Sequence, residues 1–388
     1  MIRCTAFCLA LDREHARRAR ASAVGIDRAG AEKVLTEDVG RGEVLALTTG
    51  YGEGFPVVHG WLAQRPEDGE FSMLSSEDGV VVASRDPAGT RPLYVAESGS
   101  WVSSDHRFFP LEEGVLLAPG SAYDVSTGKV VIVKRRESSF RGTFDEAGAE
   151  LARLVDRAVG ERVAGKRRVA VAFSGGLDSS ILALCARRHA SVVACTVHSR
   201  GSRDGTVAQA AADALGVELL AQDVDAKAAE REISGLALPF RATLMDRALW
   251  CIYSMASRAA AEAGAEVILL GQLADELFGG YEKYLRTLAG EGPQAAASMM
   301  EGDLRGCGMR GFVRDEAACC RWLEPRFPFA DRRVLELGRG LPLGFKVRGG
   351  MRKAVLREAA EVLGVPADLC GAPKKAAQYS SGIQKLLA

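Results

Sequence analysis

The pattern of hydrophobic and polar positions divides this chain into two parts. Up to about residue 140, short apolar stretches with alternating polar positions are separated by glycine-containing turns, a pattern that predicts β-strands. A charged and polar stretch over 134–142 then has the composition of a linker. The clearest of the predicted strands cover residues 44–48, 80–84, 94–97 and 130–133.

After residue 140 the pattern changes to helices that alternate with short stretches rich in β-branched residues. This order of strands and helices predicts a parallel sheet with helices on both faces. From about residue 274 onward the pattern is mostly helical. The predicted helices cover about 144–163, a segment that begins near 177, and then 207–215 and 245–263. The predicted strands cover 168–173, 192–197, 217–222 and 266–270.

Length and charge narrow the classes of protein to consider. A chain of 388 residues suggests two domains at roughly 100–200 residues each, here 1–140 and 141–388. The composition, 47% hydrophobic and 26% charged, is ordinary for a globular protein. Fifty basic residues balance fifty acidic ones, so the sequence gives no basic field that would favour nucleic acid. A nucleic-acid partner is therefore not expected.

The cysteines and the apolar stretches bear on the cellular compartment. The nine cysteines are scattered and contain no Cys-X-X-Cys pair, which predicts buried thiols in a reducing cytosol rather than disulfides or a zinc site. No apolar stretch is long enough to span a bilayer, and the first residues do not read as a secretory signal. We expect a cytoplasmic protein without a membrane partner.

The strongest chemical signal is a strand that leads into two glycines and then a helix. Glycines let backbone N–H groups approach an anion closely, and a helix start adds partial positive charge. Serine hydroxyls supply further donors, and a carboxylate is reasonable beside phosphates only if Mg²⁺ lies between them. We therefore expect this loop to bind the phosphates of ATP. Its residues are Ser174, Gly175, Gly176, Leu177, Asp178, Ser179 and Ser180.

Two other interpretations of this loop are weaker. The Lys-Ser/Thr ending of a Walker-type phosphate loop is absent. A plain glycine-rich β–α turn capped by Ser and Asp would explain the glycines, but not three serines that flank an aspartate.

A second motif, over 271–281, follows the predicted strand that ends at residue 270. Ligands of open parallel sheets bind outside the carboxyl ends of the strands. Asp178 and Asp275 both lie just past such ends, so the two carboxylates are expected to share a Mg²⁺ bound to pyrophosphate. Taken alone, Asp275-Glu276 would be an acidic pair at a helix N-terminus. The serine-glycine loop nearby favours the metal interpretation.

Together the two motifs resemble the synthetase domain of asparagine synthetase, one of the N-type ATP pyrophosphatases. The loop reads Ser-Gly-Gly-Leu-Asp-Ser-Ser over 174–180, and the second motif reads Ala-Asp-Glu-Leu-Phe-Gly-Gly-Tyr over 274–281. The resemblance extends from about residue 145 to residue 385. Further matches in the family's order are Arg314-Asp315, residues 324–331, Lys353 within 351–357, and Pro373-Lys374-Lys375.

This resemblance implies a fold and a reaction. The fold would be a doubly wound parallel-sheet ATP pyrophosphatase domain with a helical C-terminal part. The enzyme would be an AMP-forming ligase: a carboxylate attacks the ATP α-phosphate, and ammonia or an amine then displaces AMP. The implied cofactors are ATP and Mg²⁺, and the implied partners are a small carboxylic acid and ammonia or an amine. A homodimer is one possible oligomeric state. By the same resemblance, the family's catalytic positions correspond to Lys353 and Gln272. Its further nucleotide contacts correspond to Val171, Ala172, Phe173, Thr196, Val197, Gly271 and Lys374.

The first 140 residues resemble the family's glutaminase domain, which implies an α+β sandwich of the Ntn-hydrolase type. The matching elements are residues 85–94, Ser103-Ser104-Asp105 and Pro119-Gly120. We expect these residues to hold the fold rather than to perform chemistry. An active glutaminase of this class needs a cysteine as its first residue, because the free α-amine is the base. Here Ile2 follows the initiator methionine, and Cys4 would serve only after removal of three residues. Glutaminase activity is therefore expected to be lost.

Two departures concern the synthetase part. Asparagine synthetases carry glutamate where this chain has Gln272, and glutamine cannot act as a general base. Arg203-Asp204-Gly205 stands where the family usually has Asp-Glu, so substrate recognition is expected to differ. An adenylating, amide-forming ligase is the leading hypothesis. An ATP pyrophosphatase with a different acceptor and a non-catalytic nucleotide-binding regulatory protein are the alternatives.

Overall fold

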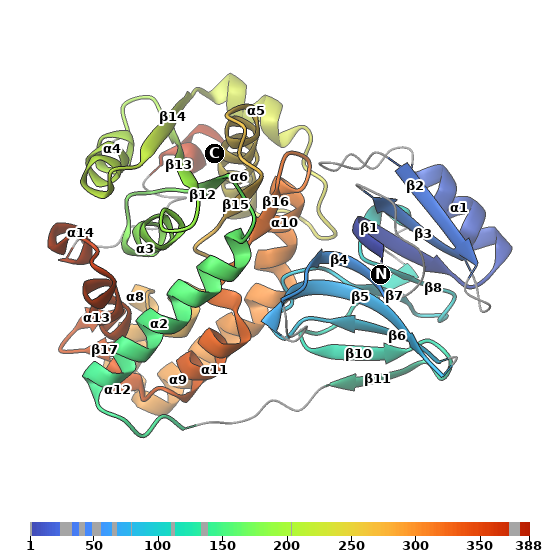
Figure 1. Ribbon diagram of the computed structural model, residues 1–388, viewed down its shortest axis with the longest axis horizontal. Coiled ribbons are helices and arrows are strands. Elements are labelled where there is room, and N and C mark those ends of the chain that lie inside the picture. The colour runs from blue at the N-terminus through green and yellow to red at the C-terminus, as the bar shows by residue number, and fades with distance from the viewer. Residues whose placement is uncertain are drawn as a thin grey trace. The chain divides into compact units, whose positions relative to one another are not determined.

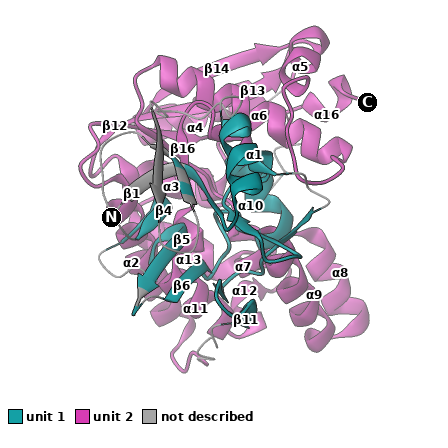
Figure 2. Cartoon of the chain, turned by 90° about the vertical axis from the view of Figure 1, so that its right-hand side faces the viewer, with its two compact units in different colours: residues 1–135, 308–316 teal, residues 136–307, 317–388 magenta. Residues whose placement is uncertain are grey.

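The computed structural model describes residues 2–23, 33–38, 43–48, 56–63, 68–78, 80–109, 113–132, 139–202, 204–371 and 381–388. It divides the chain into two compact units, which Figure 2 colours separately. The first unit contains residues 1–135 together with 308–316, and the second contains residues 136–307 and 317–388. The sequence predicted a division near residue 140, and it gave no sign that residues 308–316 belong with the first unit.

The first unit is built on one hydrogen-bonded sheet. Its described strands follow the order β11-β10-β6-β5-β4-β1-β8-β7-β9, with β3 paired to β1 and β2 paired to β3. A helix, α1 (Arg13–Ala23), and a 3₁₀ turn, η2 (His106–Phe108), accompany the sheet. The strands are β1 (Ile2–Ala10), β2 (Lys33–Asp38), β3 (Glu43–Thr48), β4 (Val57–Trp61), β5 (Glu70–Glu77), β6 (Val80–Arg85), β7 (Tyr94–Ala96), β8 (Trp101–Ser103), β9 (Gly114–Leu116), β10 (Ser121–Asp124) and β11 (Lys129–Ile132).

Strand β1 shows how alternation along a strand builds a core on each face of this sheet. Side chains of a strand point to opposite faces in turn. Phe7 and Leu9 join one buried cluster, whereas Ala6 and Cys8 join another cluster that includes Ala19 of α1. The structure therefore has a helix covering one face of a single connected sheet. The Ntn-hydrolase-like sandwich expected for this part stays a prediction.

The second unit is built on a five-stranded parallel sheet with the strand order β14-β13-β12-β15-β16 (Figure 1). Connections between parallel strands are right-handed. Since the chain steps from β12 to β13 to β14 in one direction and then returns to β15, helices α3 and α4 lie on one face and α6 lies on the other. The strands are β12 (Arg168–Ala172), β13 (Ser191–Ser199), β14 (Glu218–Val224), β15 (Val267–Leu269) and β16 (Glu324–Arg326).

The helices of this unit agree with the predicted ones where the apolar spacing was regular. The mixed α/β fold with a parallel sheet is confirmed. The sequence missed α5 and β16; β16 is three residues long, Glu-Pro-Arg, and has no apolar alternation. The helices that alternate with the first four strands are α2 (Phe144–Val163), α3 (Leu177–Ala186), α4 (Asp204–Leu215), α5 (Ala226–Ile233) and α6 (Leu244–Glu262).

The chain after β15 is mainly helical, as the sequence predicted. It includes a π-helical turn, η4 (Cys307–Gly311), and a 3₁₀ turn, η5 (Pro328–Ala330). A short hairpin joins β17 (Val347–Arg348) to β18 (Met351–Arg352). The helices are α7 (Ala274–Phe278), α8 (Glu282–Glu291), α9 (Pro293–Gly306), α10 (Phe312–Cys319), α11 (Arg332–Gly340), α12 (Leu343–Lys346), α13 (Ala354–Leu363), α14 (Ala367–Gly371) and α16 (Ile383–Leu386).

Two further findings concern the described residues as a whole. None of their helices combines the length and the apolar character that a membrane crossing requires. The eight cysteines among them whose side chains are described are all buried and free of disulfides, in line with the predicted buried thiols: Cys8, Cys185, Cys195, Cys251, Cys307, Cys319, Cys320 and Cys370.

Helix α2 is fixed at its two ends in different ways. At its start Thr143 and Glu146 form a reciprocal capping box, with the Thr143 Oγ1 accepting from the Glu146 N–H at 3.2 Å. Near its end the fully buried Arg162 donates to Asp331 Oδ2 at 3.0 Å. Arg333 also pairs with Asp331, at 2.7 Å. Burial by itself would raise the pKa of Asp331, but these two arginines hold it below its ordinary value.

Replacement of Arg162 by methionine is expected to lower the free energy of unfolding by about 3 kcal/mol, because it removes one partner of a buried carboxylate. A carboxylate whose pKa is lowered on folding stabilises the protein above its unfolded pKa, and this contribution is lost as the pH falls through the folded value. The deficit should therefore shrink on acidification. Because the folded pKa of Asp331 lies below its ordinary value of 3.8, urea unfolding followed by circular dichroism at pH 7 and at about pH 3 measures both effects. The exposed Arg153, paired with Glu150 on the same helix, gives the control Arg153→Met, for which a change under about 0.5 kcal/mol is expected.

Candidate active site

The candidate site lies where the direction of strand connections in the parallel sheet reverses. Strands β12 and β15 are neighbours, but the chain leaves β12 toward β13, on the far side from β15. The loops that follow these two strands therefore diverge outside their carboxyl ends, the usual ligand position in open α/β sheets. The serine-glycine loop follows β12, and the Asp275 motif follows β15.

The serine-glycine loop is held in shape by its own side chains. Gly175 has a φ of +69°, a conformation that favours glycine. The Ser179 Oγ accepts from the Ser174 N–H at 3.3 Å and donates to the Gly176 carbonyl at 3.1 Å. Ser174 Oγ in turn accepts from the Gly176 N–H at 3.3 Å. The loop thus has a fixed backbone immediately before helix α3.

The remaining predicted nucleotide residues lie around this loop with different degrees of exposure. Ser180 is completely buried in α3, and its hydroxyl has no hydrogen-bond partner among the described residues. The Phe173 N–H donates to the Cys195 carbonyl at 2.8 Å, which ties the end of β12 to β13. Gly271 lies close to Asp178, because a Cβ at this glycine would come within 3.2 Å of the Asp178 Cβ. Five of these side chains are buried: Val171, Phe173, Leu177, Thr196 and Val197; Ala172 is half-buried.

The centre of the site is an ion-pair cluster of three residues. The Lys353 Nζ lies 2.6 Å from both oxygens of Asp178 and 2.7 Å from the Asp275 Oδ1. The lysine is buried, whereas each aspartate side chain retains about a fifth of its exposure. Burial lowers the pKa of Lys353, and the charge of Asp178 opposes that change. The structure therefore brings together the two predicted metal ligands and the predicted catalytic lysine, which lie in three separate segments of the chain.

Backbone strain is concentrated next to this cluster. Three non-glycine residues in the described part of the chain have a positive φ, and two of them, Leu273 and Lys353, directly precede helices α7 and α13. A residue with a side chain pays about 1 kcal/mol or more in this conformation, so the surrounding structure must enforce it. In both places the helix that follows starts beside the ion-pair cluster. Such strain is typical of functional sites.

Gly280 leaves the space that the cluster needs. A Cβ at this position would overlap the Asp275 carboxylate and the Lys353 Cε. The Gly280 carbonyl also accepts a hydrogen bond from Arg352 Nη1 at 3.1 Å, so the residue beside the lysine holds the same turn. The sequence offered a signal here, the glycine pair after Phe278, but our sequence analysis gave neither Gly280 nor Arg352 a role.

A second buried carboxylate lies next to Asp275. Glu276 is buried and accepts a hydrogen bond from the Tyr281 hydroxyl at 2.7 Å. Burial raises the pKa of Glu276, and the hydrogen bond from Tyr281 and the charge of Lys353 act against that increase. Burial also raises the pKa of Tyr281. Glu276 and Tyr281 are thus a hydrogen-bonded pair near enough to Lys353 for its charge to act on the glutamate.

The hydrogen-bond partner of the Gln272 side chain is a cysteine. Its side-chain amide donates to the Cys307 Sγ at 3.0 Å, and Cys307 is buried. Cys307 is also the first residue of the π-helical turn η4, an irregularity that often occurs at functional sites. The contact joins the loop after β15 to the end of α9.

Some predicted residues cannot be placed. Lys374, the rest of 372–380, and Arg203 lie outside the described residues. Within the described part of the chain no group of three or more His, Cys, Asp or Glu side chains is arranged to hold a metal ion. The candidate metal site consists of the two carboxylates alone. Mg²⁺ is commonly bound through one or two protein carboxylates, with waters and substrate phosphates supplying the other ligands.

The reversal point of this parallel sheet, with a serine-glycine loop after β12 and a carboxylate pair beside it, is the position where open α/β proteins usually bind ligands. The family model described as asparagine synthase matches residues 150–307 and 304–387, more than half of the chain. The chain belongs to the asparagine synthase family.

Individual relatives are moderately similar. The chain is 28% identical over 279 residues to a putative asparagine synthetase [glutamine-hydrolyzing] 1 of Methanocaldococcus jannaschii, covering 63% of this chain and 51% of the relative. It is 26% identical to asparagine synthetase domain-containing protein 1 of Gallus gallus, covering 66% and 50%. The asparagine synthetase [glutamine-hydrolyzing] of Pongo abelii is 26% identical, with 81% and 63% covered. The chain thus spans about half the length of the first two.

Replacement of Gly280 by alanine is expected to lower the free energy of unfolding by roughly 1–3 kcal/mol, because the added Cβ forces the Asp275–Lys353 contact apart. Gly290 in α8 offers a matched control, since a Cβ there meets nothing within 4 Å. Gly290→Ala should be neutral or stabilise by up to about 1 kcal/mol. Thermal melting of both variants is the measurement, and equal melting temperatures would contradict the steric role of Gly280.

Proposed function

We propose that this chain is an ATP-dependent ligase that activates a carboxylic acid as an acyl-adenylate and then forms an amide. A carboxylate oxygen bonds to the α-phosphorus of ATP while the bond to pyrophosphate breaks. The nitrogen of ammonia or an amine then bonds to the acyl carbon, AMP leaves, and a proton is lost from the nitrogen. The observation that carries the proposal is the Lys353 ammonium, held between Asp178 and Asp275 beside the serine-glycine loop.

In this proposal the chain's own residues have separate tasks. The Ser174–Ser179 loop, with its fixed backbone before α3, binds the phosphates through N–H and hydroxyl groups. Lys353 stabilises negative charge that develops on the transferred phosphoryl group, a task suited to a buried ammonium in a preorganised site. The lysine is paired with the two carboxylates before a ligand binds, so its ammonium is already held at the site.

The two partly exposed aspartates fit a Mg²⁺ that carries the pyrophosphate. They are hard oxygen donors at the position where phosphates are expected, and the magnesium would neutralise charge on the leaving pyrophosphate. Their contact with Lys353 gives the carboxylate pair a positive partner when no metal is bound. ATP enters this scheme as a substrate, and magnesium as a cofactor.

In this proposal the amine step differs from that of asparagine synthetases. Gln272 stands at the position of their glutamate, and its amide group donates to Cys307 and cannot accept a proton. We therefore propose that the nitrogen substrate is an amine or ammonia supplied from outside, without glutamine hydrolysis by the first unit. The backbone of Cys4 lies within β1. A small carboxylic acid, aspartate among others, is the proposed acyl donor, and the proposed location is the cytoplasm.

Replacing either aspartate of the pair by alanine is expected to lower carboxylate-dependent exchange of labelled pyrophosphate into ATP at least about 100-fold, because each is needed to bind the phosphates and metal. The assay is run against a panel of small acids, and the acid that supports exchange identifies the acyl donor. Circular dichroism checks that Asp178→Ala and Asp275→Ala stay folded. Full exchange in either folded variant would refute the metal assignment. No exchange with any acid in the wild-type protein would favour the regulatory alternative.

A second test needs no substrate. Lys353→Met removes the positive partner of two adjacent carboxylates, so the variant should bind Mn²⁺, used in place of Mg²⁺, roughly tenfold more tightly than the wild-type protein without nucleotide. Electron paramagnetic resonance titration of free Mn²⁺ gives the affinity. Lys166→Met, which removes a surface lysine paired with Glu266, should leave it unchanged. An unaltered affinity in Lys353→Met would mean that the aspartates do not form the cation site.

A further inference from the structure

Residues 308–316 are an integral part of the first unit although they lie far along the chain from it. Arg85 is buried at the end of β6, and its guanidinium donates to four backbone carbonyls. One of them is the Gly308 carbonyl, at 2.7 Å, and the others belong to Gly89, Arg91 and Leu117. Arg85 thus joins the turn after β6 to a segment 223 positions away.

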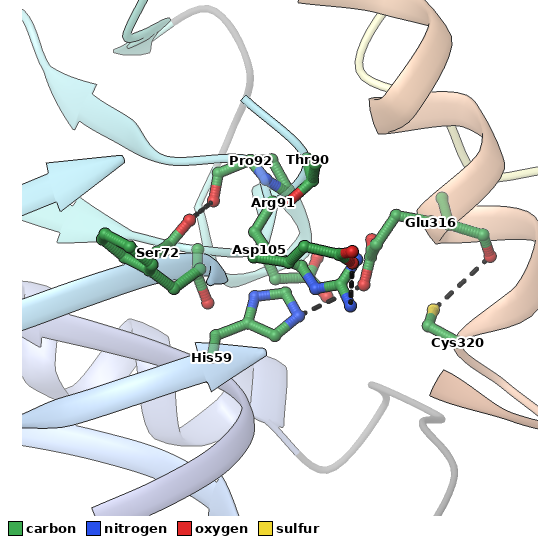
Figure 3. A network of polar contacts seen from close by, with 12 residues as sticks. His59, Ser72, Thr90, Arg91, Pro92, Asp105, Glu316 and Cys320 are labelled. Carbon is green, nitrogen blue, oxygen red and sulfur yellow. Dashed lines mark hydrogen bonds and ion pairs between the residues drawn. The ribbon is translucent and has the colours of Figure 1, made fainter. Parts of the chain in front are cut away.

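The other end of this segment is anchored by a second buried pair. The His59 Nε2 of β4 lies 3.2 Å from the Glu316 Oε1, and both side chains are almost completely buried. Figure 3 shows this pair as part of a network of polar contacts. Polar groups that are removed from water are costly to leave without a partner, so both anchors constrain the segment.

Close packing fixes the beginning of the segment as well. A Cβ at Gly308 would overlap the Pro119 ring and lie 2.8 Å from the Ala88 carbonyl oxygen. The position therefore accepts only glycine without movement of the backbone. Pro119 and Ala88 belong to the two turns that Asp86 stabilises: its carboxylate accepts from the Ala88 and Gly89 N–H groups at 3.0 and 2.8 Å, and its carbonyl accepts from the Gly120 N–H at 2.9 Å.

The residue just before this segment belongs to the candidate active site. Cys307 accepts the hydrogen bond from Gln272, and the boundary between the two units falls at the peptide bond that joins Cys307 to Gly308. Both residues lie in the π-helical turn η4. A backbone shift at Gly308 would therefore be passed directly to the Cys307 thiol, since the two residues are covalently joined.

We propose that Arg85 is a positioning residue for the candidate active site, acting through Gly308 and Cys307 on the side chain of Gln272. The first unit then has a use that requires no glutaminase chemistry, because its buried arginine holds the residue that follows Cys307 in the chain. The part of this proposal that concerns catalysis rests on the proposed function. The part that concerns the position of Cys307 does not.

The positional part is tested by alkylation of the full-length protein with iodoacetamide, with the rate at each cysteine followed by peptide mass spectrometry. Cys307 is buried in the wild-type protein and should react slowly. In Arg85→Gln and Gly308→Ala its rate should rise at least about fivefold. Cys185 and Cys8, which are fully buried in the second and first unit, should stay protected in both variants.

Matched controls remove the same chemical groups elsewhere. Arg18→Gln breaks a single ion pair of the first unit, with Glu113 at 2.9 Å. Gly302→Ala adds a Cβ in α9 where nothing lies within 4 Å. Both should leave the Cys307 rate within twofold of wild type. An unchanged Cys307 rate in both test variants overturns the proposal, and so does a parallel rise at Cys185 or Cys8, which would indicate general unfolding.

The catalytic part compares the two half-reactions. In Arg85→Gln, pyrophosphate exchange should stay within twofold of wild type, while transfer of the acyl group to the amine slows at least about tenfold. Equal slowing of both steps, or of neither, overturns the positioning role. If the wild-type protein shows no exchange at all, the proposed function fails, and the alkylation experiment still decides whether Arg85 positions Cys307.

Discussion

The second unit depends on one interaction, the sharing of the Lys353 ammonium by the carboxylates of Asp178 and Asp275. The three side chains come from the first turn of α3, from the first turn of α7 and from the residue before α13. Two like charges so close would repel strongly in a partly buried place, and the lysine removes that repulsion. The strained backbone at Leu273 and Lys353, and the missing side chain at Gly280, are the structural conditions for this contact.

The same interaction connects the fold to the proposed chemistry. A phosphate-binding loop needs a fixed backbone, and hydrogen bonds of Ser174 and Ser179 supply it before any ligand binds. Preorganised charge in a site that excludes water acts more strongly than the same charge in solvent. The buried lysine and the rigid loop are therefore suited to a reaction in which charge moves along a phosphate chain. The neighbouring Glu276 and Tyr281 form a further hydrogen-bonded pair beside the lysine.

In the first unit, two residues of the stretch that resembles a glutaminase domain have structural roles. Arg85 and Asp86 belong to the stretch that resembles the glutaminase domain, and the structure buries both. Arg85 donates to backbone carbonyls and Asp86 accepts from backbone N–H groups, so each satisfies polar groups that would otherwise be costly to bury. These contacts explain the arginine and the aspartate without reference to glutamine.

The sequence by itself determined the elements whose signals are local. The span 144–163 was predicted as a helix and is observed as α2, because regular apolar spacing and a capping box act within a few residues. Four of the five parallel strands were predicted within a few residues of their ends, and the ordered motifs indicated the family and the residues of the ion-pair cluster. Strand β16, with only three residues, has no periodic pattern and was missed.

Only the tertiary structure decided which distant residues meet. The hydrogen bond from the Arg85 side chain to the Gly308 carbonyl joins two residues that lie 223 positions apart, and no local pattern in either segment predicts it. The contact of Gln272 with Cys307 and the steric need for Gly280 also depend on how separate elements pack. Secondary-structure propensity and hydrophobic periodicity indicate which helix or strand a residue belongs to and whether its side chain is buried. The identity of its partner is set by the long-range packing of the whole chain, which a single sequence does not encode in any one window.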